Sequence, residues 1–319
     1  MKRYDVFNGD ADGICALLQL RQHEPHPTAQ LVTGVKRDIT LLKRLTDVKN
    51  ADITVLDISL ESNRESLEIL LRQKNNVFYA DHHFAGTLPD ANNLTTHIDP
   101  APLTCTSLII NRLLPRPANP WAIVGAFGDN LDEPAAQLAR ELGYDKEAID
   151  QLRELGVLLN YNGYGTQREY LFFPPEILYS LVLDYANPLD FFADSPALQT
   201  LRKGYRQDMA MANACPPVHE NNVCKIYILP EEPWARRVAG VYANTLARTH
   251  PALAHALATP NIDGSLRISL RAPLDNRTGA DVVCRQFPGG GGRAAAAGIN
   301  ALPADQLDTF VRALSLQFS

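Results

Sequence analysis

The first hundred residues alternate between short apolar runs and longer amphipathic segments. This alternation is typical of parallel strands joined by crossover helices. It predicts five strands, at residues 4–7, 30–35, 52–56, 76–80 and 95–98. Among the first four strands it predicts three helices, at residues 14–23, 38–46 and 62–73. We therefore expect an α/β domain built on an open parallel sheet.

Beyond residue 105 the pattern becomes helical. It predicts helices at 106–114 and 121–127, and mostly helical structure across 134–184. These helices extend the first domain, which we place at residues 1–184. The segment 185–222 loses its periodicity and contains NPLDFF, DSP and NACPPVHENN. Its turn-forming residues predict an interdomain linker.

A second, smaller α/β domain is expected at residues 223–319. Its pattern starts with the strand-like run CKIYIL and a helix at 234–248, followed by a hairpin-like pair of strands around Asn261 and Gly264. A helix near 279–286, the run GGGGRAAAAG and a final helix from Ala304 complete it. We find no internal repeat.

The composition is that of a soluble globular chain of about two domains, with 319 residues, 45% hydrophobic and 21% charged. The net charge of −6 argues against a protein that coats nucleic acid, because such proteins carry a basic excess. Residues 225–319 nevertheless hold ten Lys and Arg against seven Asp and Glu, so we expect the anion-facing part there.

The cysteines and the N-terminus indicate a cytoplasmic protein. Five scattered cysteines without a C-x-x-C pair predict neither a disulfide framework nor a zinc knuckle. The N-terminus lacks the apolar core of a signal peptide, and no apolar run is long enough to span a membrane.

Acidic side chains and imidazoles follow three of the predicted strands. The first strand ends in FNGDADG, the third in LDIS and the fourth in DHH. Because parallel strands end at the same edge of a sheet, we expect these groups to share a small volume. A fifth acid, at the end of AIVGAFGDN, can close the cluster from the side. The groups are Asp10, Asp12, Asp57, Asp81, His82, His83 and Asp129.

So many acids repel and desolvate one another unless cations neutralise them. Mixed carboxylate and imidazole ligands without thiolates suit Mn²⁺, Mg²⁺ or Fe²⁺ better than structural zinc. A cluster of this size can hold two ions about 3.5 to 4 Å apart, which activate a water for displacement at phosphorus.

Each segment also has an ordinary structural explanation. Asp10 and Asp12 suit a turn or a helix N-cap, and Asp57 suits a cap after a strand. His82 and His83 suit a solvated loop. The coincidence of three such segments at one end of the sheet favours the metal site.

The second domain offers candidates for anion binding. The four glycines at 289–292 lack Cβ atoms, so their N–H groups can approach an anion, and Arg293 follows them. A flexible turn explains the same run. Arg271 ends a strand-like run, where an arginine is also typical of a solvated edge. Three tyrosines in the helical region suit either base stacking or packing: Tyr161, Tyr164 and Tyr170.

Five motifs, in this order, resemble those of the DHH phosphoesterases. They are FNGDADG, VLDIS, DHH, GAFGDN and the glycine-rich GGGGRAAAAG. The last is similar to the signature of the DHH-associated C-terminal domain found in nanoRNases, RecJ-like exonucleases and cyclic-dinucleotide phosphodiesterases. The resemblance covers most of the chain. It implies a parallel-sheet DHH domain with a helical extension, a smaller C-terminal domain and an active site in the interdomain cleft.

The resemblance also implies roles for single residues. Asp10 would bind one manganese ion and Asp12 the other, with Asp57 bridging the pair. His82 and Asp129 would complete the second site. The cofactor would be two Mn²⁺ ions, with Mg²⁺ or Fe²⁺ as possible replacements.

Further roles concern the substrate. His83 would lie near the scissile phosphate, and Asp81 would be a ligand or would orient the histidines. The resemblance implies that the substrate-binding residues are Arg271, Gly290, Gly291, Gly292 and Arg293.

Two positions depart from the family's pattern. Asn8 stands where the family usually has a metal-binding histidine, so it would be a weaker, uncharged ligand. Arg293 stands where a histidine usually follows the four glycines, and its permanent charge and bidentate fork still suit a phosphate.

These observations predict a manganese-dependent phosphodiesterase that hydrolyses short oligonucleotides, RNA or DNA, or linear dinucleotides such as pGpG, to mononucleotides. Short substrates are expected because the chain leaves no room for the extra nucleic-acid-binding domain of RecJ-like enzymes, and because its charge is acidic. Two alternatives stay open: a phosphatase of a small bisphosphorylated nucleotide, and a catalytically weak nucleotide-binding regulator. A homodimer is a further possibility.

Overall fold

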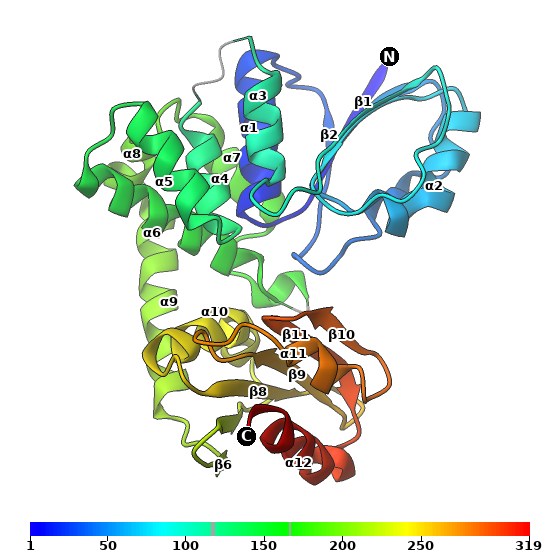
Figure 1. Ribbon diagram of the computed structural model, residues 1–319. Helices are drawn as coiled ribbons and strands as arrows, with labels where there is room; N and C mark the ends of the chain where they lie inside the picture. Colours follow the sequence, from blue (N-terminus) through cyan, green and yellow to red (C-terminus); the bar gives the residue numbers. More distant parts are fainter. Residues whose placement is uncertain (116–118, 166) are drawn as a thin grey trace. The chain divides into compact units, whose positions relative to one another are not determined.

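The computed structural model describes residues 1–115, 119–165 and 167–319. The chain divides into two compact units, Met1–Lys203 and Gly204–Ser319 (Figure 1). Each unit has its own sheet and its own hydrophobic core.

The first unit contains the expected parallel sheet. Its five strands lie in the order β2-β1-β3-β4-β5, and every neighbouring pair is parallel. All five predicted strands are confirmed, although β2 is shorter than expected. The strands are β1 (Lys2–Phe7), β2 (Gln30–Val32), β3 (Ala51–Leu56), β4 (Asn76–Asp81) and β5 (Leu94–Ile98).

The strand order reverses direction between β1 and β3. Helix α1 (Ala11–His23) leads from β1 to β2, whereas α2 (Leu60–Arg72) leads from β3 the other way to β4. The two helices consequently lie on opposite sides of the sheet (Figure 1). In open α/β sheets, ligands bind at such a reversal, beyond the carboxyl ends of the strands. The remaining predicted helix, at 38–46, is only the short 3-10 helix η1 (Leu41–Leu45).

Helices make up the rest of the first unit, as expected. The central one is α4 (Trp121–Gly128), in which every residue is buried. A Cβ atom at Gly128 would lie 2.3 Å from the Cβ atom of Ala11, so glycine lets α4 approach the start of α1. This approach brings Asp129, the next residue, towards the ends of the strands. The other helices are α3 (Thr106–Leu113), α5 (Asp132–Glu141), α6 (Lys146–Gly163), η2 (Arg168–Tyr170) and α7 (Pro175–Leu183).

The segment 185–222, where we expect an interdomain linker, is mostly helical. Helices α8 (Pro188–Asp194) and α9 (Pro196–Ala214) occupy most of it, and the two units divide within α9. The turn-forming residues lie at the helix ends: Asn187 accepts a hydrogen bond from the N–H of Leu189 and caps α8. The boundaries 184 and 223 of the predicted domains stay predictions.

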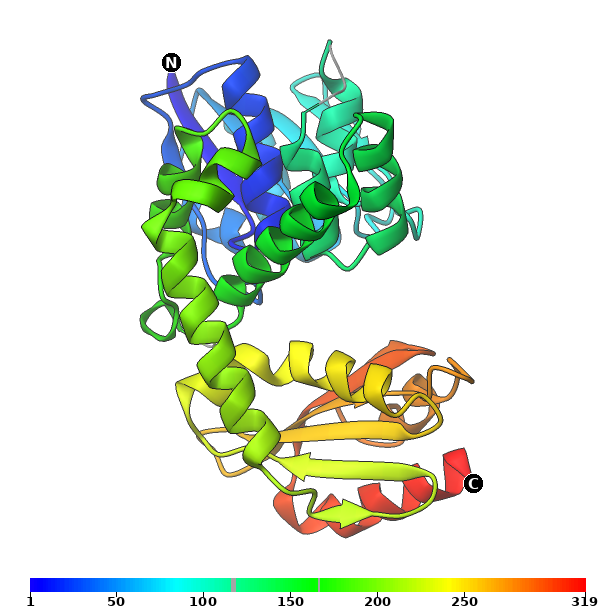
Figure 2. The same cartoon turned by 90° about the vertical axis from the view of Figure 1, so that its left-hand side faces the viewer.

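The second unit is a six-stranded mixed sheet in the order β10-β11-β9-β8-β7-β6. Only the β7 and β8 pair is parallel. Helices α10 (Pro233–Thr249) and α12 (Leu307–Phe318) cover opposite faces (Figure 2). Its other elements are β6 (His219–Glu220), β7 (Cys224–Ile228), β8 (Ala254–Pro260), β9 (Leu266–Arg271), α11 (Ala280–Cys284), β10 (Gly290–Arg293), β11 (Ala296–Leu302) and η3 (Ala304–Gln306).

The glycine run is not a turn between a helix and a strand. Its last three glycines and Arg293 form β10, which pairs with β11 at the edge of the sheet. Gly292 has a φ of 139°, and a Cβ atom there would lie 2.5 Å from the Cα atom of Ala297. A larger residue would push the two strands apart.

Two other expectations concern membranes and cysteines. In the part of the chain that the structure describes, no helix has the length and apolar character needed to span a lipid bilayer. All five cysteines are free thiols, and four of them are buried.

Candidate functional site

The acids that follow the strands lie together at the strand reversal. Asp10 and Asp12 follow β1, Asp57 follows β3, and Asp81 is the last residue of β4. All four are at most 2% exposed. Like charges at this depth demand compensation, because burial makes an unpaired carboxylate costly. We call Asp10, Asp12, Asp57, Asp81, His82, His83 and Asp129 the carboxylate site.

His82 connects two of these acids. Its Nε2 atom lies 3.4 Å from Oδ1 of Asp57 and 3.8 Å from Oδ2 of Asp129. On the other side of the ring, Nδ1 lies 3.1 Å from the carbonyl oxygen of Thr104. A carbonyl can only accept, so Nδ1 carries a proton and Nε2 is the ring atom that faces the acids. This is the arrangement by which proteins prepare a histidine to bind a metal.

His83 lies beside this group and is bound to Asp81. Its Nδ1 atom lies 2.6 Å from Oδ1 of Asp81. Burial alone would lower the pKa of His83, but the hydrogen bond and the charge of Asp81 raise the pKa above its ordinary value. The His83 side chain is 44% exposed, so it is accessible from outside. One donor atom each from Asp57, His82 and His83 lie within 4.8 Å of one another.

Asp12 receives its hydrogen bonds from the start of α3. The N–H groups of Thr106 and Ser107 donate to its two oxygens, at 2.8 and 2.7 Å, and the Ser107 hydroxyl also donates. The Thr106 hydroxyl donates to Asp57 at 3.1 Å. A helix N-terminus stabilises a buried carboxylate in this way. Asp10 meanwhile caps α1 by accepting from the N–H of Gly13. Asp10 and Asp12 therefore each accept hydrogen bonds from the start of a helix, and both also belong to the carboxylate site.

Lys36 is a member of the cluster that the sequence analysis missed. Its Nζ atom lies 2.5 Å from Oδ2 of Asp10, 3.0 Å from Oδ1 of Asn160 and 3.8 Å from Oδ1 of Asp129. Lys36 follows β2, the neighbour of β1, so the rule that gathers the acids at the strand ends could also have found this lysine.

The pKa values divide the acids into two groups. Burial would raise the pKa of Asp10, but the charge and hydrogen bond of Lys36 lower it. Burial and the charges of Asp12 and Asp10 raise the pKa of Asp57 well above its ordinary value. Burial is also the main reason that the pKa of Asp129 rises to about 6, although Lys36 opposes the rise. Asp57 and Asp129 therefore lack a sufficient cation, whereas Asp10 has one.

The backbone of Asp57 is in a conformation that few residues adopt. Its φ of 59° lies in the left-handed region, which aspartate and asparagine tolerate better than most other residues. Backbone strain of this kind is concentrated at functional sites. It turns the chain sharply at the end of β3, where the carboxylate site begins.

The side chain of Asn8 contacts the backbone of Lys36. Its Nδ2 atom donates to the carbonyl oxygen of Lys36 at 3.2 Å. Its Oδ1 atom is buried without a hydrogen-bond partner among the described residues. The predicted ligand Asn8 thus has an oxygen to offer, while its amide nitrogen holds the backbone that carries Lys36.

The carboxylate site fits a divalent metal ion by the chemistry of its donors. Its carboxylate and imidazole groups, without a thiolate, suit Mn²⁺ or Mg²⁺. Oδ2 of Asp81, like Oδ1 of Asn8, is buried without a hydrogen-bond partner in the described part of the chain. The raised pKa values of Asp57 and Asp129 express the same demand for positive charge.

The second unit places its two predicted arginines on one face of its sheet. Arg271 in β9 pairs with Ala296 in β11, and Ala296 pairs with Arg293 in β10. Directly paired residues of antiparallel strands share a face, so we call Arg271, Ala296 and Arg293 the arginine row. Nε of Arg271 donates to Oδ1 of Asn244 at 2.7 Å, while Arg293 is exposed.

The tyrosines prove to differ from one another. Tyr161 is fully buried and packs against Phe172, with 5.9 Å between ring centroids, so packing explains it. Tyr164 lies against Lys36, whose Nζ atom is 5.4 Å from the ring centroid. Tyr170 belongs to η2 and is half-buried.

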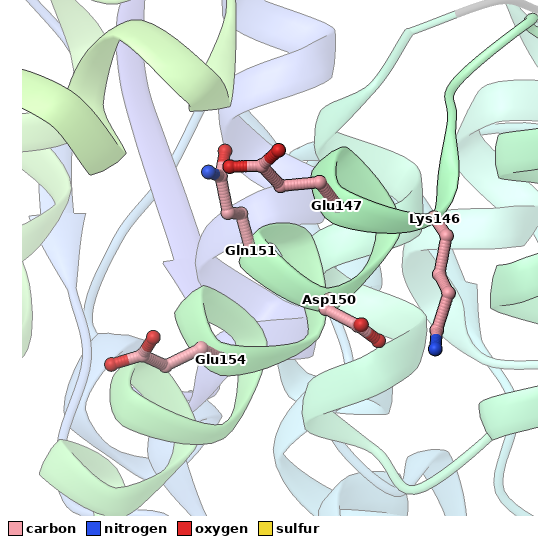
Figure 3. Close-up of a pocket in the computed structure, with 5 residues that line it drawn as sticks. All are labelled: Lys146, Glu147, Asp150, Gln151 and Glu154. Carbon is pink, nitrogen blue, oxygen red and sulfur yellow. The ribbon is translucent and has the colours of Figure 1, made fainter.

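A pocket on α6 is separate from these residues. Figure 3 shows the side chains that line it, all from two turns of one helix: Lys146, Glu147, Asp150, Gln151 and Glu154. Asp150 and Glu154 are paired with Arg153 and Arg202. Glu154 and Asn160, which contacts Lys36, are six residues or about 9 Å apart along α6. This pocket contributes nothing to the carboxylate site.

Comparisons with known proteins identify the fold. RecJ from Thermus thermophilus in complex with Mn²⁺ has 18% identity and a TM-score of 0.67, covering 99% of this chain and 52% of RecJ. The pGpG-specific phosphodiesterase PggH from Vibrio cholerae has 15% identity and a TM-score of 0.54, covering 99% of both chains. An exopolyphosphatase-related protein from Bacteroides fragilis has 14% identity and a TM-score of 0.55, covering 99% of this chain and 91% of that protein.

These similarities confirm the predicted two-part α/β fold, and they agree with the resemblance drawn from the motifs. The chain spans about half the length of the Thermus RecJ. No family model matches the sequence, and no curated protein is similar to it. The site roles expected from the motifs stay predictions.

Proposed function

We propose that this protein is a divalent-metal-dependent phosphodiesterase that hydrolyses short oligonucleotides or linear dinucleotides such as pGpG to mononucleotides. The observation that carries the proposal is the carboxylate site at the strand reversal. There, buried acids with raised pKa values surround a histidine whose Nε2 faces them. Perturbed pKa values of this kind are typical of functional sites.

The ion would be held by Asp57, His82 and Asp129, with Asp12 beside them. Mn²⁺ is the proposed ion, and Mg²⁺ is its natural competitor because the same ligands suit both. A divalent ion in such a site lowers the pKa of its water and polarises a phosphoryl oxygen. Thr106 holds Asp57 by its hydroxyl, and the start of α3 holds Asp12, so both carboxylates are fixed before the substrate arrives.

His83 is the proposed partner of the scissile phosphate. Its hydrogen bond to Asp81 fixes the ring and favours the protonated form. A protonated imidazole stabilises the negative charge that develops on a phosphoryl oxygen during the displacement. Because its side chain is 44% exposed, His83 can reach a bound phosphate, whereas Asp81 is fully buried and acts through His83.

The second unit would bind the rest of the substrate. Arg271 and Arg293 are two strands apart on one face, which separates their Cα atoms by about 10 Å. Guanidinium groups bind phosphate through paired hydrogen bonds. Gly290, Gly291 and Gly292 of β10 lie at the edge of the sheet without Cβ atoms, so an anion can approach this backbone closely, although the N–H of Gly290 is already bonded to the carbonyl oxygen of Phe287.

The shared fold supports this reaction class. The similar structures include an exonuclease and a phosphodiesterase specific for pGpG, and PggH has the same extent as this chain. The pGpG specificity of PggH motivates the choice of a short substrate. A cytoplasmic location, a homodimer and an active site in a cleft between the domains stay predictions.

Product analysis tests the proposal. The purified chain is incubated with Mn²⁺ or Mg²⁺ and with labelled RNA and DNA of two to about ten nucleotides, together with pGpG and a nucleoside 3′,5′-bisphosphate. We expect mononucleotides from the shortest substrates, and loss of turnover in Asp57→Asn. Release of inorganic phosphate from the bisphosphate alone would favour the phosphatase instead. Binding of pGpG without turnover under any metal would favour the regulator.

A further inference from the structure

The two halves of the carboxylate site differ in the ligands they offer to a metal. The resemblance implies an ion at Asp10 and a second at Asp12, His82 and Asp129, with Asp57 between them. At the first position the chain supplies Asn8, an uncharged amide, where the family usually has a histidine. The nitrogen of that amide is already bonded to the carbonyl oxygen of Lys36.

The ammonium group of Lys36 is already bound to an oxygen that the first ion would need. Nζ of Lys36 is 2.5 Å from Oδ2 of Asp10. A divalent ion held by the same oxygen would be about 2.1 Å from it. The two positive centres cannot share this space, because at about 4 Å their repulsion is already several kcal/mol in a protein interior.

Lys36 is held there by several elements. Its Nζ atom also donates to Asn160 of α6 at 3.0 Å. Its backbone N–H donates to the carbonyl oxygen of Gly163 at 2.9 Å, and its carbonyl accepts from Asn8. The side chain is only 23% exposed. A Cβ atom at Gly9 would lie 2.0 Å from the carbonyl oxygen of Gly34, so the segments after β1 and β2 are in close contact.

We infer that the ammonium group of Lys36 replaces the first metal ion, so that this protein works with one divalent ion per chain. The ion lies at Asp57, His82 and Asp129. Lys36 compensates the charge of Asp10, and Asn8 is a positioning residue for Lys36. The inference rests on the proposed function, since it concerns the metal of that same site.

This arrangement explains Asn8 and Lys36 together. If Lys36 takes the place of the first ion, no histidine is needed at position 8 to bind that ion. The amide of Asn8 instead donates a hydrogen bond to the carbonyl oxygen of Lys36. An ammonium group neutralises charge and donates hydrogen bonds, but it does not activate water. The activation of water would therefore be supplied by the ion that Asp57, His82 and Asp129 would hold.

The test is the number of manganese ions bound to the full chain. Native mass spectrometry counts the ions at saturating Mn²⁺, and electron paramagnetic resonance distinguishes an isolated ion from a spin-coupled pair. We expect one ion per chain and the six-line spectrum of isolated Mn²⁺. The double variant Asn8→His with Lys36→Ala should bind two ions and show a coupled spectrum. Lys43→Ala, which removes an exposed lysine nearby, should still bind one.

Each outcome bears on a different claim. Two ions in the unchanged protein would overturn the inference and leave the proposed function intact. One ion in the folded double variant would also overturn it, because Lys36 would then not limit the count. No bound ion in the folded, unchanged protein would overturn both. One ion without turnover of any substrate would overturn the proposed function alone. Circular dichroism checks that each variant is folded. If the variant with Lys36→Ala does not fold, Lys36→Met replaces it, because methionine keeps the apolar stem of the side chain.

Discussion

The two halves of the carboxylate site solve the same electrostatic problem in opposite ways. Asp10 and Asp57 are both 2% exposed, and each follows a strand of the same sheet. Yet the pKa of Asp10 is lowered and that of Asp57 is raised well above its ordinary value. The difference is Lys36, which is 2.5 Å from Asp10.

The comparison teaches where the protein needs an external cation. The Asp10 half carries its own positive charge, because Lys36 compensates the carboxylate of Asp10. The Asp57 half has His82, whose Nδ1 is bonded to a carbonyl oxygen and whose Nε2 faces Asp57 and Asp129. The uncompensated charge of Asp57 and Asp129 indicates where a bound metal ion would stabilise the protein most.

The largest expected effect follows removal of charge from the Asp57 half. In Asp57→Asn we expect hydrolysis to fall by about 1,000-fold or more, because the ion loses its central ligand. Asparagine also tolerates the left-handed backbone at this position. Steady-state rates with saturating Mn²⁺ measure the effect. The matched control is Asp52→Asn, on the same strand β3 but 37% exposed at its side chain.

The same variant should be more stable than the unchanged protein when both are free of metal. Since the pKa of Asp57 is raised, its ionised form destabilises the fold, and we expect a gain of about 1 to 2 kcal/mol at pH 7.5. Chemical denaturation in a chelating buffer gives the free energy of unfolding. A loss of stability would contradict the claim that this half lacks a cation.

Removal of Lys36 should have the opposite effect on stability. In Lys36→Ala, Asp10 stays buried without its partner, so we expect the metal-free protein to lose about 3 kcal/mol. Added Mn²⁺ should recover part of the loss by taking the place of the ammonium group. Thermal unfolding with and without Mn²⁺ measures both changes, and Lys43→Ala should stay within about 0.5 kcal/mol of the unchanged protein. An unaltered melting temperature in Lys36→Ala would contradict the claim that Lys36 compensates the charge of Asp10.

The pH dependence of stability sharpens the comparison. The pKa of Asp129 is 3.8 in the unfolded chain and about 6 in the folded one, so the folded state binds more protons between these values. The stability present below pH 3.8 is therefore lost as the pH rises through 6, by about 1 to 2 kcal/mol because solvent partly screens this side chain. Denaturation of the metal-free protein at pH 5 and pH 7 should show this fall, and Asp129→Asn should show a smaller one. An equal slope in both proteins would refute the assignment.

The smallest effects concern the arginine row in the second unit. In Arg271→Ala and Arg293→Ala we expect KM for a dinucleotide to rise about 10-fold with little change in kcat, since each loses one phosphate contact worth about 1.4 kcal/mol. Arg293→Lys keeps the charge but not the fork, so it should recover only part of the affinity. Arg312, on α12, provides a control arginine. A fall in kcat with an unchanged KM would contradict the claim that Arg271 and Arg293 bind the substrate.

The parallel sheet and its acids could be predicted from the sequence because both depend on local signals. Short apolar runs, with Asp10, Asp57 and Asp81 at their ends, identify the strands and where they stop. Helix α9 was missed, because Gly204 and flanking turn residues hide a periodicity carried by Leu198 and Leu201.

Other features depend on tertiary context. Strand β11 contains alanines and a glycine, which are weak strand formers, and it exists because β9 and β10 pair with it on both sides. Lys36 follows a strand of only three residues, and its role depends on Asn160, 124 positions away. The position of Lys36 after a strand could be predicted, but its contact with Asn160 leaves no pattern in the sequence.

The most direct test of the account is a crystal structure of the full chain with Mn²⁺, in which anomalous scattering locates the ions. The account predicts one peak bounded by Asp57, His82 and Asp129, with Lys36 still bonded to Asp10. A peak between Asn8 and Asp10 with Lys36 displaced, or no peak at the carboxylate site, would contradict it.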